Sequence, residues 1–175
     1  MPRCAFIGLG VMGYPMAGYL QNAGNQTTVY NRTVSKAEKW VEAYGGSLGA
    51  TPCEAAQDAD VVMLCVGNDD DVRSVVYGES GVLAGMTSGS VLVDHTTASA
   101  FLAKELEEAC TEKGIGFVDA PISGGQAGAE SGQLSVMCGG SQEAFSKIEQ
   151  VIEVYSKISI LVGPAGHGQL TKMVN

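Results

Sequence analysis

Three glycines near the start of the chain have the spacing of a nucleotide phosphate site. They follow an apolar run, Cys4-Ala5-Phe6-Ile7, and precede a helical pattern. In such a strand, turn and helix, the first glycine permits the tight turn and the second lets a pyrophosphate approach the backbone. The third lets the helix pack close to the strand. The segment Gly8-Leu9-Gly10-Val11-Met12-Gly13 is therefore predicted to bind a dinucleotide, with a purely structural turn as the alternative.

The residues about 20 positions past this turn bear on the choice of cofactor. NAD-specific folds carry an acidic residue there, which holds the ribose hydroxyls. Residues 21 to 37 contain neither Asp nor Glu. Arg32 can instead pair with a 2′-phosphate, and Thr33 can donate a hydroxyl, which favours NADP(H). Asn31 can still serve a ribose hydroxyl, so NAD(H) stays open, and a solvated arginine beside a helix-capping threonine is the plain alternative.

A lysine close to the last residue has a setting that suggests proton transfer. The pattern is Gly166-x-Gly168-x-x-x-Lys172-x-x-Asn175. Lys172 and Asn175 are three positions apart, which puts them on one face of a helix. A desolvated lysine can exchange a proton with a hydroxyl or carbonyl, and the Asn175 amide can orient a substrate. A solvated surface lysine is the alternative.

A second run of small residues follows the predicted strand that ends at Asp119. Ser123-Gly124-Gly125 exposes backbone amides and one hydroxyl, a suitable cradle for a carboxylate. In open α/β sheets, ligands bind beyond the carboxyl ends of strands, where this loop falls. A glycine-rich connection without a ligand fits the composition equally well.

Composition limits the remaining classes. The 175 residues carry a net charge of -9 and a sequence pI of about 4.6. This charge argues against binding to nucleic acid or to anionic membrane surfaces. No basic segment precedes an apolar one at the start, and the apolar runs are too short to span a membrane. The five cysteines include no CxxC and the two histidines stand far apart, so we expect a reduced compartment such as the cytoplasm and no metal site.

Strand-like and helical patterns alternate along the whole chain. This alternation predicts an α/β fold, a Rossmann-like, doubly wound, mainly parallel sheet with helices on both faces. Thr51…Glu54 and Ser35…Glu38 read as capping boxes that begin helices. The predicted strands are Arg3–Ile7, Thr27–Tyr30, Val61–Cys65, Ser90–Asp94, Gly116–Asp119, Gln133–Cys138 and Ile158–Val162.

Four motifs in order resemble the β-hydroxyacid dehydrogenase family, the group of 3-hydroxyisobutyrate and 6-phosphogluconate dehydrogenases. They are Phe6-Ile7-Gly8-Leu9-Gly10-Val11-Met12-Gly13, Asp94-His95-Thr96-Thr97, Asp119-Ala120-Pro121-Ile122-Ser123-Gly124-Gly125 and Gly166-x-Gly168-x-x-x-Lys172-x-x-Asn175. The resemblance implies that Lys172 is the catalytic acid/base and that Ser123, Gly124, Gly125 and Asn175 hold the substrate. It also implies that Thr97 contacts the nicotinamide side of the cofactor. Val66 and Gly67 stand where the family often has Leu-Pro over the adenosine half, and Asn31-Arg32-Thr33 resembles the NADP-preferring members.

The resemblance further implies an activity and a domain plan. The expected enzyme is an NADP-preferring oxidoreductase that interconverts a small, carboxylate-bearing 3-hydroxy acid and its semialdehyde. 3-Hydroxyisobutyrate dehydrogenase and glyoxylate or succinic semialdehyde reductases are examples, and an NAD(P)-binding sensor or interaction module without catalysis is the alternative. Family enzymes continue into a long interdomain helix and a helical second domain, through which they form homo-oligomers. We therefore expect a Rossmann domain over residues 1–165, the start of the interdomain helix over 166–175, an exposed Lys172 and weak or no activity without the second domain.

Overall fold

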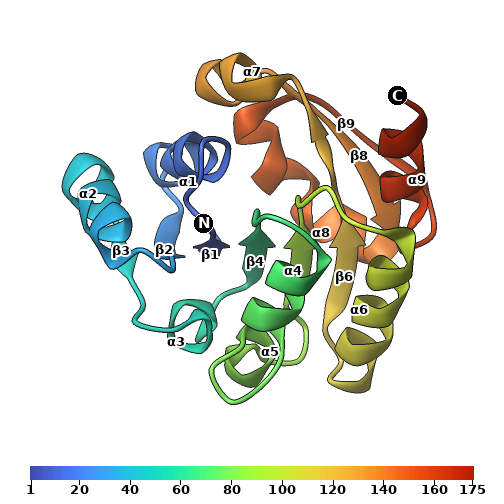
Figure 1. The fold of residues 1–175 in the computed structure, drawn as a ribbon, viewed down its shortest axis with the longest axis horizontal. Coiled ribbons are helices and arrows are strands. Elements are labelled where there is room, and N and C mark those ends of the chain that lie inside the picture. Colours follow the sequence, from blue (N-terminus) through green and yellow to red (C-terminus); the bar gives the residue numbers. More distant parts are fainter.

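A computed structural model describes residues 1–175 and shows one sheet flanked by helices (Figure 1). The strands are β1 (Arg3–Ile7), β2 (Gln26–Tyr30), β3 (Ser47–Leu48), β4 (Val61–Leu64), β5 (Val91–Asp94), β6 (Gly116–Asp119), β7 (Ile122–Ser123), β8 (Leu134–Gly140) and β9 (Ser156–Gly163). The helices are α1 (Gly13–Asn22), α2 (Val34–Tyr44), α3 (Pro52–Ala56), α4 (Asp69–Val76), α5 (Val82–Gly85), α6 (Ala100–Glu112), α7 (Gly125–Ser131), α8 (Gln142–Ile152) and α9 (His167–Val174). None of these helices combines the length and apolarity that a membrane crossing requires.

The sheet has the strand order β3-β2-β1-β4-β5-β6-β8-β7, and β9 pairs with β8. The first six strands in this order are parallel. β8 runs antiparallel to β6 and β7, and β9 runs parallel to β8. The chain path reverses direction between β1 and β4, the switch point at which doubly wound sheets bind ligands. The predicted Rossmann-like fold is confirmed.

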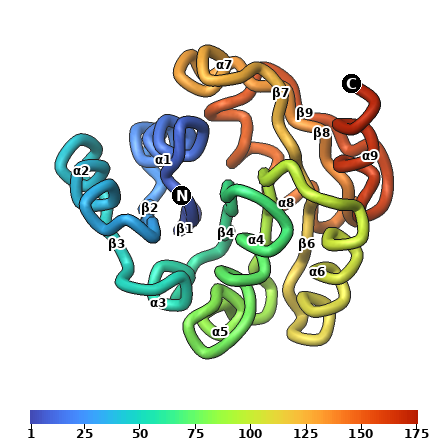
Figure 2. The backbone as a smooth tube through the Cα atoms, viewed as in Figure 1, coloured from blue at the N-terminus to red at the C-terminus, as the bar shows by residue number.

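Two apolar cores lie on opposite faces of this sheet. Successive strand residues point to opposite faces, so along β1 Phe6 belongs to one core and Ile7 to the other. The first core includes Leu20 of α1, Trp40 of α2 and Ile148 of α8. The second is filled from α3, α4, α5 and α6. Because both faces are covered, the central strands are apolar throughout, which is why they could be predicted as continuous runs. The backbone trace in Figure 2 shows the same helices on both sides of the strands.

The predicted strands are all present, with ends shifted by up to two residues. β3 and β7 were not predicted, because each is only two residues long and lacks an apolar run. One of the two predicted capping boxes is wrong. Ser35 lies inside α2, whose N-cap is Thr33, and no side chain caps that helix.

The other box is present in a modified form. The Thr51 hydroxyl accepts a hydrogen bond from the Glu54 amide at 3.1 Å, as a capping residue should. The Glu54 carboxylate, however, accepts from the amide of Ala50 at 2.9 Å, one residue before the expected partner. The start of α3 is thus fixed by both side chains.

Candidate active site

The three glycines of the first turn meet three different surroundings. Gly8 has a φ of 99°, and its amide donates to the Tyr30 carbonyl at 2.9 Å. A Cβ on Gly13 would run into the carbonyl of Gly8, so only glycine lets α1 pack this close to the turn. A Cβ on Gly10 would meet no atom within 4 Å. Gly8 therefore allows the turn, Gly13 allows the close packing of α1, and Gly10 leaves open space beside the backbone.

The turn presents free amides at the start of α1. The amides of Gly10, Val11, Met12 and Gly13 donate no hydrogen bond within the protein. Orphan amides at a helix N-terminus, together with the helix dipole, favour an anion such as a phosphate. The amide of Leu9 is different, because it donates to Asn31 Oδ1 at 2.9 Å, and the Leu9 side chain is fully buried.

A cavity of about 590 Å³ opens beside these amides. Of the residues predicted to bind cofactor, the glycine turn, Asn31, Arg32, Val66 and Gly67 line it, whereas Leu9, Thr33 and Thr97 do not. Asn31 uses both ends of its amide on the backbone, since Nδ2 also donates to the Thr33 carbonyl at 3.1 Å. Its observed part is to hold the glycine turn against the end of β2. The exposed Arg32 guanidinium makes no ion pair in the protein.

Residues that the sequence analysis did not single out complete the wall of the cavity. They include Asp71, Ser74 and Ser80. Nothing in their local sequence marks them, because they come from segments that the parallel topology brings to the same sheet edge. The open cavity, the free amides and the space at Gly10 together fit an extended nucleotide.

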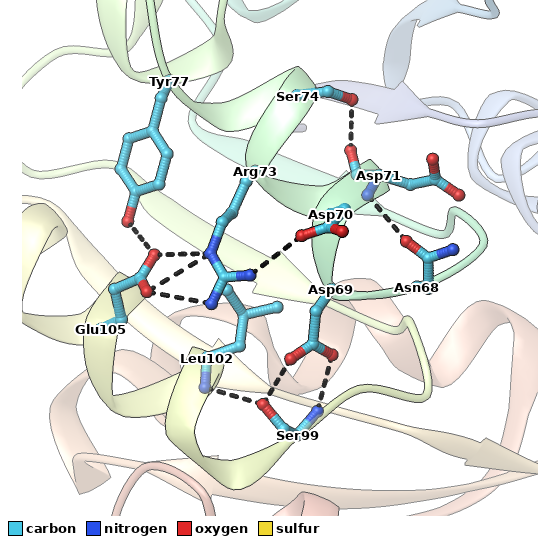
Figure 3. Close-up of polar contacts among 10 residues, drawn as sticks. All are labelled: Asn68, Asp69, Asp70, Asp71, Arg73, Ser74, Tyr77, Ser99, Leu102 and Glu105. Atoms are coloured by element: carbon cyan, nitrogen blue, oxygen red, sulfur yellow. Dashed lines mark hydrogen bonds and ion pairs between the residues drawn. The ribbon is translucent and has the colours of Figure 1, made fainter.

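The loop after β5 is held by contacts to α4 and to the loop between β4 and α4. The amide of Val66 donates to the Thr96 hydroxyl at 3.1 Å. Ser99 donates to the Asp69 carboxylate through its amide at 2.9 Å and through its hydroxyl at 2.5 Å (Figure 3). The same hydroxyl accepts from the Leu102 amide and caps α6. Thr97, between these anchors, is exposed.

Arg73 of α4 makes a second link between α4 and α6, through Glu105 of α6 (Figure 3). Its guanidinium lies 3.1 Å from Glu105 and 3.3 Å from Asp70, and Tyr77 donates to Glu105 at 2.8 Å. These side chains are about 40% exposed or more, so the ion pairs stabilise the protein little. The Ser99–Asp69 contact adds two hydrogen bonds to a carboxylate, and the same Ser99 hydroxyl caps α6.

Two buried acids stand side by side at the carboxyl ends of β5 and β6. Asp94 and Asp119 are register partners, and both are inaccessible to solvent or nearly so. Burial, with a smaller effect from the nearby Asp119, raises the pKa of Asp94 to about 7, although hydrogen bonds from Thr96 lower it. Burial also raises the pKa of Asp119, against four backbone hydrogen bonds that lower it. Asp94 Oδ1 accepts from the Thr96 amide at 3.0 Å, so this acid orders the loop that carries Thr97.

The predicted substrate residues come together at the far end of α9. Asn175 Nδ2 donates to Ser123 Oγ at 3.4 Å, although the two residues are 52 positions apart. Gly124 and Gly125 are exposed and begin α7. Lys172 is half-buried, where the sequence analysis expected an exposed side chain, because α9 lies against the sheet. It makes no ion pair within the protein.

Comparison with known proteins agrees with this arrangement. Residues 3–163 match the family described as the NAD binding domain of 6-phosphogluconate dehydrogenase. The chain belongs to this family. It is an NAD(P)-binding domain of an oxidoreductase family, which confirms the resemblance found in the four motifs.

Individual members are similar over the whole chain. An uncharacterized oxidoreductase of Shewanella frigidimarina is 58% identical over 175 residues, 100% of this chain and 60% of that protein. A probable mitochondrial 3-hydroxyisobutyrate dehydrogenase-like protein of Arabidopsis thaliana is 38% identical over 99% of this chain and 52% of its own length. The structure of Mycobacterium tuberculosis 3-hydroxyisobutyrate dehydrogenase with L-serine has a TM-score of 0.93 and 31% identity, over 100% of this chain and 59% of that one. The chain thus spans between half and two thirds of the length of these proteins.

Proposed function

We propose that this chain forms the cofactor domain of an NADP-preferring oxidoreductase that interconverts a small 3-hydroxy acid and its semialdehyde. The observation that carries the proposal is the joint placement of three features on one sheet edge. These are the free amides of the glycine turn, the Ser123–Asn175 contact and the half-buried Lys172 of α9. We further propose that a helical second domain completes the site and the oligomer, because about two fifths or more of each relative lies outside the part that this chain matches.

The residues of this chain bind the cofactor, orient the substrate and donate one proton to it. The amides of Gly10 to Gly13 donate hydrogen bonds to the pyrophosphate, and Arg32 pairs with the 2′-phosphate. The substrate carboxylate lies at Ser123, Gly124 and Gly125, and Asn175 orients it. A bound reduced nicotinamide supplies a hydride for the carbonyl carbon. Lys172 gives the carbonyl oxygen its proton, and in the reverse direction it takes the proton from the hydroxyl.

Turnover in the full-length protein tests this proposal. NADPH oxidation is followed with glyoxylate and with the succinic, methylmalonic and tartronic semialdehydes. We expect turnover with at least one of them and loss of turnover in Lys172→Ala, with NADPH affinity close to wild type. Lys172→Arg should not restore activity, since a guanidinium does not release a proton near neutral pH. NADPH binding without turnover on any substrate would favour a binding module without catalysis.

Arg32 decides the cofactor preference in this proposal. A charge-assisted contact to phosphate contributes about 1.5–3 kcal/mol, so Arg32→Ala should weaken NADPH roughly 10- to 100-fold and leave NADH nearly unchanged. Calorimetric titration of both cofactors into the chain measures this difference. Lys36→Ala is the matched control, because Lys36 is an exposed cation of α2 that does not line the cavity. Equal losses for NADPH and NADH in Arg32→Ala would show that the 2′-phosphate is not its partner.

A further inference from the structure

The buried side chain of Gln169 holds the peptide groups on both sides of Thr97. Its Nε2 donates to the Thr96 carbonyl at 2.7 Å, and its Oε1 accepts from the Ala98 amide at 3.1 Å. Gln169 is 3% exposed, and it belongs to α9, more than 70 positions along the chain from this loop. One carboxamide therefore fixes the position of Thr97 relative to the last helix.

Gln169 is itself held in place by the sheet. The carboxylate of Asp119, at the end of β6, accepts from the Gly166 amide at 2.8 Å and from the Gln169 amide at 2.9 Å. Asp119 is fully buried, and these bonds satisfy two of the orphan amides around the first turn of α9. A Cβ on Gly168 would collide with the Met137 carbonyl, so the helix also lies very close to β8. The first turn of α9 is therefore in contact with β6 and β8 as well as with the Thr97 loop.

Gln169 and Lys172 are three residues apart on α9, which places them on neighbouring positions of the helix surface. Asn175 follows three residues later, as the C-cap of the helix. Gln169 contacts the Thr97 loop at the first turn, and Asn175 contacts Ser123 at the last. Lys172 lies between them, about 4.5 Å along the helix axis from each. The helix backbone therefore fixes the distance from Lys172 to the residues that contact the Thr97 loop and Ser123.

We propose that Gln169 is a positioning residue that couples the Thr97 loop to Lys172. A nucleotide that contacts Thr97 shifts the loop, and the two hydrogen bonds of Gln169 pass that shift to α9 and to the lysine amine. The inference rests on the proposed function in one respect, since it takes Thr97 as a contact of the bound nucleotide. It assigns a part in the site to a side chain that touches no reacting atom.

Backbone NMR of the chain during NADPH titration tests the coupling. In the wild type, the amide signals of Thr97 and Ala98 should shift together with those of residues 170–172. In Gln169→Met, which has a similar volume and no amide, the loop signals should still shift and those of residues 170–172 should not. Gln142→Met on α8 is the control, since Gln142 is exposed and its side chain hydrogen-bonds only to Ser146 of its own helix. Equal shifts of α9 in the wild type and in Gln169→Met would overturn the inference.

A second measurement needs no nucleotide and separates this inference from the proposed function. The Ala98 amide should be protected from hydrogen exchange in the wild type and should exchange roughly 10-fold faster in Gln169→Met, because one hydrogen bond is lost. Gln169→Glu keeps the acceptor for Ala98 and loses the donor to Thr96, so protection of Ala98 should largely return. Unchanged exchange of Ala98 in Gln169→Met would also overturn the inference. A failure of NADPH to bind the wild-type chain would count against the proposed function, and the exchange result would still decide the part played by Gln169.

Discussion

Gly10 and Gly13 serve the same loop for different physical reasons, and substitution by alanine should separate them. A methyl group on Gly13 has no room beside the Gly8 carbonyl, so Gly13→Ala should destabilise the chain by about 1–3 kcal/mol through overpacking. Gly10 has open space and a φ outside the left-handed region, so Gly10→Ala should change stability by less than about 0.5 kcal/mol.

Gly10→Ala, which should change stability little, should weaken cofactor binding strongly. The methyl group of Gly10→Ala occupies the space through which a pyrophosphate approaches the backbone, so NADPH should bind at least about 10-fold more weakly. Chemical denaturation and calorimetric titration of the two variants measure both effects. A stable Gly10→Ala variant with wild-type affinity would show that the phosphates do not pass this residue.

His95 should lower stability in acid. Burial lowers its pKa to about 4 from the ordinary histidine value of 6.5. Its Nδ1 donates to the Ala120 carbonyl and its Nε2 accepts from the Tyr155 hydroxyl, both at 2.7 Å, so the neutral ring is the one that the fold holds. As the pH falls from 6.5 to 4, the unfolded chain binds a proton that the folded chain does not. Stability is lost in that window, by up to about 1.4 kcal/mol per pH unit.

Asp94 has the opposite effect on the pH dependence of stability, over nearly the same pH range as His95. Its pKa is raised from 3.8 to about 7, so between these values the folded chain binds the extra proton, and stability rises as the pH falls. We therefore expect the two contributions to offset each other in the wild type. Asp94→Asn should expose the His95 effect, with urea-unfolding free energies that fall more steeply between pH 6.5 and 4 than in the wild type. Parallel pH curves for the two proteins would contradict this account.

At the scale of elements, Ser99 joins α4 to α6 and caps α6 at the same time. Loss of an N-cap hydroxyl costs about 1 kcal/mol, and loss of a hydrogen bond to a carboxylate costs about 1.5–3 kcal/mol. Ser99→Ala should therefore destabilise the chain more than Ser141→Ala. Ser141 is the matched control, because its hydroxyl caps α8 at 3.0 Å, the same distance as Ser99 to Leu102, and contacts no acid. Equal losses in denaturation experiments would mean that the link between α4 and α6 contributes nothing.

The sheet of the whole molecule has at one edge a strand, β9, with exposed apolar side chains. β9 pairs on one side only, and its residues Ile158, Ile160 and Val162 are 41–51% exposed. An apolar edge strand is a template for pairing with other chains. Ile160→Lys should lower the aggregated fraction formed on heating, measured by light scattering, and change the unfolding free energy by less than about 0.5 kcal/mol. Phe101→Lys is the control, since it removes a more exposed apolar side chain from a helix and should leave aggregation as it was.

The amino-acid sequence by itself determined the fold class, the glycine turn and the order of the strands along the chain. The first predicted strand matches β1 residue for residue, because a strand buried on both faces is an unbroken apolar run. The glycine turn was equally readable, since its steric needs act between residues a few positions apart. The false box at Ser35 shows the limit of such patterns, since two residue types at the right spacing do not decide where a helix begins.

Only the tertiary structure decided how the site is held together. Asp119 binds amides 47 and 50 positions away, and Gln169 reaches a loop 71 and 73 positions away. Asn31, predicted to serve a ribose hydroxyl, lines the cavity and also braces the glycine turn from 22 positions away. The short strands β3 and β7 exist only because neighbouring strands offer them partners. Such hydrogen bonds depend on which strand ends the parallel topology places side by side, and no local pattern of residues contains that information.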